Sequence, residues 1–122
     1  MSEVAGPETA LRWPGRERLP LLPGITASVA RGEQLSAVLY TLNAGALVPP
    51  HDHESEEFGQ VIRGSLELEI GGRTTVLAAG EGFLIPGHVP HGARAGDDGC
   101  ELLECYAPPR APMALAPQPV AE

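Results

Sequence analysis

The 122-residue sequence contains no lysine, so each of its eight strongly basic side chains is an arginine. This absence excludes an enzyme that works through a lysine Schiff base or a lysine general base. Acidic residues outnumber basic ones, and the formal net charge is -8 at pH 7. An acidic surface repels the phosphate backbone of DNA and RNA, so we expect no nucleic-acid partner.

Long apolar runs are also missing. No stretch approaches the roughly 20 apolar residues that span a bilayer, and the first residues lack the basic start and apolar core of a signal peptide. Only two cysteines are present, Cys100 and Cys105. Their odd spacing in a predicted strand places them on opposite faces, which argues against a disulfide between them. We therefore expect a cytoplasmic protein without a membrane segment.

Sustained helical periodicity is absent too, and the chain shows short apolar runs separated by turn residues instead. The predicted strands cover residues 35–42, 58–62, 66–70, 74–78, 83–85 and 101–106. The pair Gly71-Gly72 between two of them predicts a hairpin. Short strands at this spacing are typical of an antiparallel sandwich or barrel, so the predicted fold class is all-β.

One domain is expected, a barrel over residues 21–110, because a chain of this length can bury one core and shows no internal repeat. An N-terminal arm over residues 1–20 carries charges, prolines and the only tryptophan, Trp13. Residues 111–122 are mostly alanine and proline, which predicts a flexible C-terminal tail.

Histidine and glutamate gather in one segment. His51 and His53 are two residues apart, so a strand would present both imidazoles on one face. Glu57 begins the next predicted strand, and His91 adds a fourth group from a distant segment. Imidazole and carboxylate together suit divalent Fe, Mn, Co, Ni, Cu or Zn. Each residue alone could be structural or solvated, but together the four predict one transition-metal ion with two open coordination positions.

The same segments resemble the two motifs of the cupin superfamily. The first motif, G-x5-H-x-H-x3-E-x6-G, is matched by Gly45, His51, His53, Glu57 and Gly64. The second, G-x5-P-x-G-x2-H-x3-N, is matched by Gly80, Pro86 and His91, with His88 in place of glycine and Ala95 in place of asparagine. The resemblance implies a jelly-roll β-barrel and metal ligands at His51, His53, Glu57 and His91.

His88 lies three residues before His91, on the turn into the predicted strand. A fifth ligand would crowd the ion. We therefore expect His88 to be a residue of the pocket rim or a proton shuttle at the pocket mouth.

The last predicted strand supplies further polar candidates. Glu104 and Tyr106 share one face, and Arg110 follows just past the strand end. If that face is the interior, Glu104 can serve as general acid or base, Tyr106 can contact the substrate, and Arg110 can clamp a carboxylate. If it is the exterior, Glu104 is solvated, Tyr106 is packing and Arg110 is a surface cap. Alternation alone allows both.

This segment is similar to that of small cupins that open the ring of unsaturated uronate sugars in pectin and alginate breakdown. Those enzymes carry Asp-x-Phe-x-Pro-x-Arg, and Glu104, Tyr106, Pro108 and Arg110 stand at the corresponding places. Glutamate replaces aspartate and tyrosine replaces phenylalanine, while Glu57 stands where those enzymes tend to carry a glutamine ligand. The resemblance implies a pocket for an anionic, carboxylate-bearing substrate without naming it.

The leading hypothesis is a metal-dependent isomerase, lyase or cyclase that acts on a small anionic molecule, sugar-acid-like or a secondary metabolite. One alternative is an Fe(II)-dependent dioxygenase, which would use both open positions for substrate and dioxygen. Another is a barrel that binds a small molecule without catalysis. Cupins of this size commonly pair, often through an N-terminal strand, so the resemblance also implies a homodimer.

Overall fold

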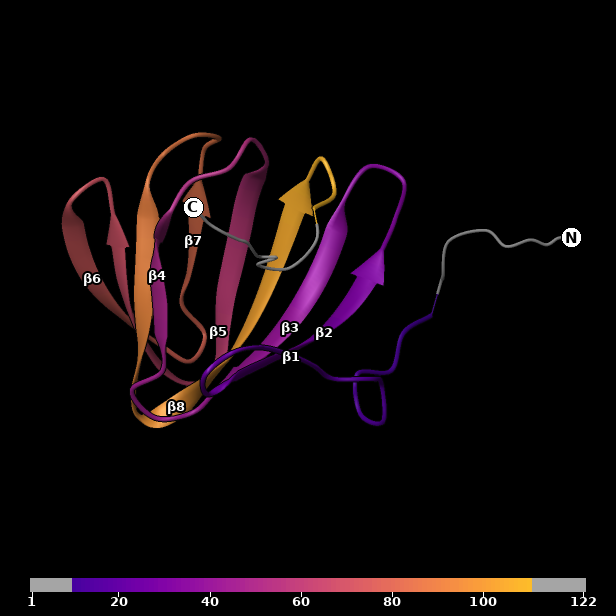
Figure 1. Cartoon of the computed structure of the whole chain (residues 1–122), viewed down its shortest axis with the longest axis horizontal. Coiled ribbons are helices and arrows are strands. Elements are labelled where there is room, and N and C mark those ends of the chain that lie inside the picture. The colour runs from indigo at the N-terminus through magenta and orange to yellow at the C-terminus, as the bar shows by residue number, and fades with distance from the viewer. Residues whose placement is uncertain (1–9, 111–122) are drawn as a thin grey trace, which may run out of the picture.

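The computed structural model describes residues 10–110, which form eight strands and no helix (Figure 1). The strands are β1 (Leu19–Leu22), β2 (Ile25–Arg31), β3 (Ser36–Leu42), β4 (Leu47–His51), β5 (Glu56–Ile70), β6 (Arg73–Ala78), β7 (Gly82–Ile85) and β8 (His91–Ala107). Every pairing is antiparallel. The all-β prediction is confirmed. Residues 1–9 and the predicted tail over 111–122 lie outside the described residues. Nothing among residues 10–110 forms a helix that could cross a membrane.

Two long strands, β5 and β8, run through both halves of the barrel. The second half of β8 pairs with β3 and with the first half of β5, and the first half of β8 pairs with β4 and with the second half of β5. The strands β1, β2 and β7 extend one half, and β6 extends the other. The sheet therefore bends along β5 and β8 into two facing layers, a jelly-roll barrel (Figure 1).

The bend depends on two glycines that face each other. Gly64 in β5 has a φ of +81° and Gly99 in β8 has a φ of +78°. A Cβ on Gly64 would lie 2.0 Å from the carbonyl oxygen of Gly99. The register between β5 and β8 shifts on both sides of this point. Only glycine allows two backbones to approach so closely in this conformation.

Aliphatic side chains fill the space between the two layers. The largest fully buried side chains are Ile25, Val38, Val61, Leu66, Ile85 and Cys100. Along β5, Leu66 and Leu68 are buried while Glu67 and Glu69 are exposed, as their alternation predicts. Cys100 is buried and Cys105 is half-buried, and both are free thiols, as their odd spacing predicts.

The described part of the N-terminal arm packs against the barrel. Arg16 Nε donates a hydrogen bond of 2.9 Å to the Val29 carbonyl, and the Ser28 hydroxyl donates one of 2.9 Å to the Glu17 carbonyl. The guanidinium of Arg16 lies 5.9 Å from the centre of the Trp13 ring. Strand β1 begins at Leu19 and therefore runs across the boundary that we expected after residue 20.

Candidate metal centre

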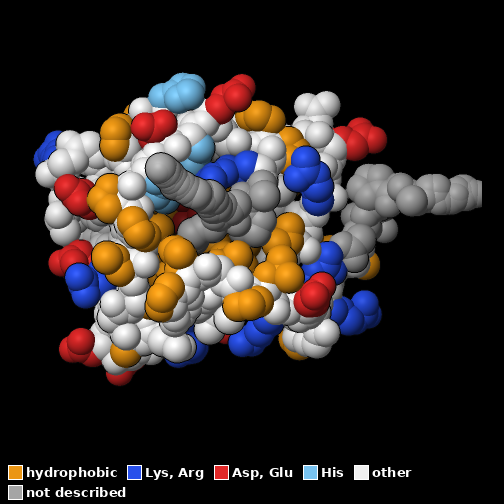
Figure 2. All heavy atoms as spheres, viewed as in Figure 1, with side chains coloured by type: hydrophobic (Ala, Val, Ile, Leu, Met, Phe, Trp, Pro, Cys, Tyr) orange, Lys and Arg blue, Asp and Glu red, His pale blue; other side chains and the backbone are white. Residues whose placement is uncertain are grey.

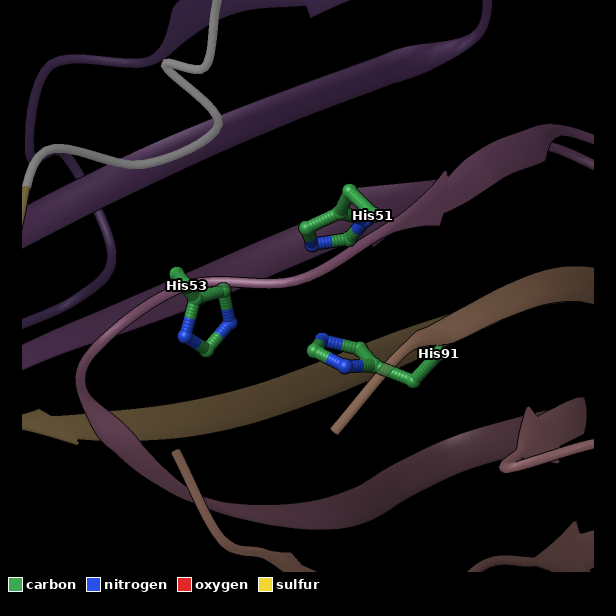
Figure 3. Close-up of side chains that lie close together, drawn as sticks. All are labelled: His51, His53 and His91. Atoms are coloured by element: carbon green, nitrogen blue, oxygen red, sulfur yellow. The ribbon is translucent and has the colours of Figure 1, made fainter. Parts of the chain in front are cut away.

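Three histidines converge inside the barrel (Figure 3). His51 is the last residue of β4, His91 is the first residue of β8, and these two are direct strand partners. His53 lies in the loop after β4. One ring nitrogen from each histidine lies within 4.8 Å of the other two, and the ring centres are 4.4, 4.9 and 5.5 Å apart. The three imidazoles form a candidate metal site.

His53 reaches this site by a different route from the one expected. The sequence placed His51 and His53 on one strand, but β4 ends at His51. Pro49 and Pro50 in β4 have no N–H to give to the sheet, which weakens the pairing of this strand. Beyond it, the backbone N–H of His88 donates a hydrogen bond of 2.7 Å to the His53 carbonyl. The loop, rather than strand alternation, directs the His53 ring.

Backbone carbonyls fix the orientation of each imidazole. The Nδ1 atoms of the three rings pair with carbonyl oxygens as follows: His51 with Pro49 at 2.9 Å, His53 with Ser55 at 2.9 Å, and His91 with Val89 at 2.8 Å. A carbonyl only accepts, so each Nδ1 carries a hydrogen and Nε2 is the atom that turns to the site. Metal-binding histidines use this arrangement, in which the second nitrogen is held by a backbone or carboxylate oxygen.

Glu57, in β5, lies against the histidines. Its Oε1 is 2.9 Å from His53 Nε2 and 3.3 Å from His91 Nε2, and its side chain is 3% exposed. Burial alone would raise the pKa of Glu57, but the hydrogen bond to His53 and the contacts with His91 and Glu104 outweigh it and hold the pKa well below its usual range. A buried carboxylate anion thus faces the imidazoles, and a cation, a shared proton or a metal ion, must balance it.

One buried nitrogen makes no hydrogen bond. His91 Nε2 has no partner of good geometry among the described residues. Its 3.3 Å approach to Glu57 is an attraction between charges rather than an aligned hydrogen bond. An unsatisfied buried nitrogen is costly, and a metal ion satisfies it. Imidazole and carboxylate donors suit a divalent transition metal, so the residues fit the cofactor that the sequence predicts.

The inner wall of the pocket carries Glu104 and Tyr106. Both face the interior, with exposed fractions of 9% and 3%, so the interior alternative is the one that the fold adopts. The Tyr106 hydroxyl donates to Glu104 Oε1 and lies 2.7 Å from the Tyr40 hydroxyl. Burial, together with the charge of Glu57, raises the pKa of Glu104 well above its usual range. The raised pKa favours the protonated form of Glu104.

Arg110 lies beside these groups at the pocket. Its guanidinium carbon is 5.2 Å from the centre of the Tyr106 ring. Its backbone is anchored by the Ser36 hydroxyl, which bonds both the N–H and the carbonyl of Arg110 at 3.1 Å. The guanidinium makes no ion pair with a carboxylate of residues 10–110. Figure 2 shows histidine and arginine side chains next to each other on one face of the molecule.

One small pocket of about 40 Å³ is lined by most of these groups, namely His51, Glu57, His91, Glu104, Tyr106 and Arg110. Polar groups of the site lie on its wall together with aliphatic side chains. The aliphatic part of the lining is Ile25, Leu42, Val48, Leu66, Leu68 and Leu102.

His88 stands apart from the pocket. Its side chain is 73% exposed, with Nδ1 3.8 Å from the Asp52 carboxylate, and it is not among the residues that line the pocket. It occupies the surface beside the loop that carries His53.

Tyr40 belongs to the site and was missed in the sequence. It lies in the run predicted as a strand over residues 35–42, at an inward position between Val38 and Leu42. A hydroxyl among aliphatic inward positions is the signal that could have found it, because a buried hydroxyl needs a partner. The partner could not be named without the register between β3 and β8.

The chain is similar to known proteins in both sequence and structure. The family described as "Cupin domain" matches residues 38–106. The chain is 28% identical over 80 residues to "Pectin degradation protein KdgF" of Dickeya dadantii (strain 3937), covering 65% of this chain and 73% of that protein. It is 31% identical over 107 residues to "Polyketide synthase CurC" of Streptomyces cyaneus, covering 86% of this chain and 64% of that protein. The solved structure of KdgF from Halomonas sp. is 26% identical with a TM-score of 0.76, covering 93% of this chain and 100% of that chain.

Proposed function

The chain belongs to the cupin domain family, and on that premise we propose that it is a metal-dependent isomerase, lyase or cyclase acting on a small anionic molecule. The proposed ligands are His51, His53, Glu57 and His91. The observation that carries the proposal is that backbone carbonyls hold all three Nδ1 atoms, so that the three Nε2 atoms turn toward one another beside a carboxylate. A histidine that only fills a core does not need two further ring nitrogens and a carboxylate beside its Nε2 atom.

Three imidazoles and one carboxylate leave two positions open on an octahedral ion. A divalent ion bound there supplies Lewis-acid polarisation of a substrate oxygen. The pocket next to the ligands is where a substrate would approach them.

Three side chains of the chain itself would then act on the substrate. Arg110 holds a carboxylate through paired N–H donors, which no protein carboxylate of residues 10–110 occupies. Glu104 gives or takes a proton at the carboxyl oxygen that Tyr106 does not bind, and its raised pKa favours the protonated form. Tyr106 fixes the orientation of Glu104 and packs beneath the guanidinium of Arg110.

The relatives support this substrate range without narrowing it. One is named for pectin degradation and the other for polyketide synthesis. Both sugar acids and secondary metabolites therefore stay within the proposal.

The test begins with protein purified without added metal. Elemental analysis should find close to one divalent transition-metal ion per chain. Unsaturated uronic acids and polyketide-like keto acids should then be converted without uptake of dioxygen. Bound iron together with substrate-dependent oxygen consumption would replace the proposal with a dioxygenase. Binding of these ligands without any conversion would replace it with a non-catalytic binding protein.

A further inference from the structure

The pocket changes from polar to aliphatic along the strands of one half of the barrel. His51 and His91 are strand partners, and the next pair of β4 and β8 that lines the pocket is Val48 and Ala93. Leu68 of β5 is the partner of Ala93 on its other side and is buried. One step along these strands, the pocket wall therefore changes from imidazole to aliphatic side chains.

The other half of the barrel shows the same change. The inward residues of β8 run from Tyr106 through Glu104 to Leu102, and all three line the pocket. Leu42 of β3 and Ile25 of β2 are strand partners that line it as well, and each is 2% exposed. A molecule with its polar end at the histidines would thus have its other end against aliphatic side chains from both halves.

The pocket wall offers few partners to a neutral polar group. None of the residues that line the pocket is serine, threonine, asparagine or glutamine. The hydroxyls of Tyr40 and Tyr106 bond each other, and that of Tyr106 also donates to Glu104. The guanidinium of Arg110 lies beside the Tyr106 ring, at the polar end. A substrate hydroxyl at the aliphatic end would therefore lose its hydration without gaining a partner.

The pocket is also small. Its volume is about 40 Å³, and a water molecule needs about 10–15 Å³ of such space. The space therefore corresponds to roughly three or four water molecules. It suits a short chain better than a sugar ring that carries several hydroxyls.

We propose that the pocket selects acids with an oxygenated, anionic head and a short apolar tail. The head lies at the histidines and Arg110, and the tail lies against the aliphatic side chains that include Ile25, Leu42 and Leu68. This inference rests on the proposed function, in which the metal ion and Arg110 hold the head. Within the substrate range of that function, it favours acids without hydroxyl groups on the tail over sugar acids.

The experiment compares acids that share one head. Pyruvate, 2-oxobutanoate and 2-oxopentanoate differ only in the length of the apolar tail, and 4-hydroxy-2-oxopentanoate adds one hydroxyl to it. Calorimetry measures their dissociation constants on Zn²⁺-loaded protein, because zinc has no redox chemistry. Each added methylene should tighten binding about 4-fold. The hydroxyl should weaken binding about 10–100-fold relative to 2-oxopentanoate.

A variant of the wall tests where the tail lies. Val48→Thr places a hydroxyl on the aliphatic wall with little change in volume. It should weaken the binding of 2-oxopentanoate several-fold and that of pyruvate much less. Val76→Thr is the matched control, because Val76 is 66% exposed on β6 and does not line the pocket. It should bind every acid of the series as wild type does.

Three results would count against the inference. Equal affinity across the series, or tighter binding of the hydroxylated acid, would overturn it while the proposed function stands. A preference for longer tails that folded Val48→Thr retains in full would place the tail outside this pocket and overturn it as well. If none of the acids binds, pyruvate included, the pocket does not hold the anionic head, and the proposed function fails together with the inference.

Discussion

Among single residues, Arg110 has the clearest consequence for what the pocket binds. Its backbone is hydrogen-bonded to Ser36 and its guanidinium lies over the Tyr106 ring. These contacts hold the positive charge at the pocket. The planar fork of a guanidinium matches a carboxylate with two parallel hydrogen bonds. We therefore expect Arg110 to give the pocket a preference for anions.

Replacing this residue tests that role. Arg110→Ala should weaken the binding of carboxylate ligands about 10–100-fold, because a hydrogen bond to a charged group contributes about 1.5–3 kcal/mol. Calorimetry on metal-loaded protein measures the change. Arg31→Ala, at the exposed end of β2, is the control and should bind as wild type does. If Arg110→Ala loses its metal as well, Arg110 supports the fold and its role at the substrate is wrong.

At His91, protons would compete with the proposed metal ion. Burial alone would lower the pKa of His91, but its interactions with Glu57 and with the Val89 carbonyl raise it overall. An imidazolium cannot bind a metal ion, so metal affinity should fall as pH falls through this raised pKa. The metal-free fold has the opposite dependence. There a raised pKa stabilises the fold below the unfolded value of about 6.5, and this contribution is lost as pH rises through the folded value.

Melting temperatures of metal-loaded and metal-free protein test both pH dependences together, that of metal affinity and that of the stability of the metal-free fold. The difference between them should widen from about pH 6 to about pH 8, the range in which histidine titrates. A difference that stays constant or narrows over this range would contradict the assignment of His91.

At the scale of elements, β5 shows a feature that the sequence did not predict, the continuity of one long strand. The sequence predicted two strands, over 58–62 and 66–70, but the structure has one strand of 15 residues, Glu56–Ile70. Gly64 lies in the gap between the two predicted strands and is a bend within the single strand, with φ +81°. The choice between the two is made by Gly99 on β8, which is distant in the sequence.

The same limit separates the parts of the site that could be predicted from those that could not. His51, His53 and Glu57 lie close together along the chain, so their spacing alone pointed to one cluster. For Glu104, alternation gave two faces, and only the packing of β8 between its neighbours selects the inward one. Tyr40 is 66 residues from Tyr106, and nothing local relates the two. Register between distant strands carries that information.

A pair of glycine variants tests the account of the bend. Gly64→Ala should lower the free energy of unfolding by roughly 3 kcal/mol or more, because it adds backbone strain and a collision with the Gly99 carbonyl. Gly72→Ala has a similar φ of +85° but nothing within 4 Å of its Cβ. It should cost only about 1–2 kcal/mol, the strain alone. Urea unfolding measures both, and equal losses would show that the close approach of β5 and β8 is not what the glycine serves.

For the whole molecule, the proposed metal centre joins segments that are far apart in the chain. His51 ends β4, Glu57 lies at the start of β5, and His91 begins β8. An ion bound by all of them would hold the two layers together and would bind the folded state only. Stability should therefore depend on metal by simple linkage.

Removal of the metal tests this dependence. Binding at 100 times the dissociation constant stabilises a fold by about 2.7 kcal/mol, which for a domain of this size corresponds to a shift of roughly 10 °C in melting temperature. Dialysis against a chelator should lower the melting temperature by about this amount, and added metal should restore it. His51→Ala, measured in the same way, should show no response to chelator or metal.

The central claim is that His51 and His91 hold a metal ion, and the four histidines of the chain provide a direct test with an internal control. The measurement is the metal content per chain of wild-type protein and of the variants His51→Ala, His91→Ala and His88→Ala, by elemental analysis after identical purification. His88 is the control, because its side chain is exposed and lies outside the pocket. Wild-type and His88→Ala should carry close to one ion per chain, and the other two should lose most of it. Full metal content in both His51→Ala and His91→Ala, with folded protein in each case, would contradict the assignment.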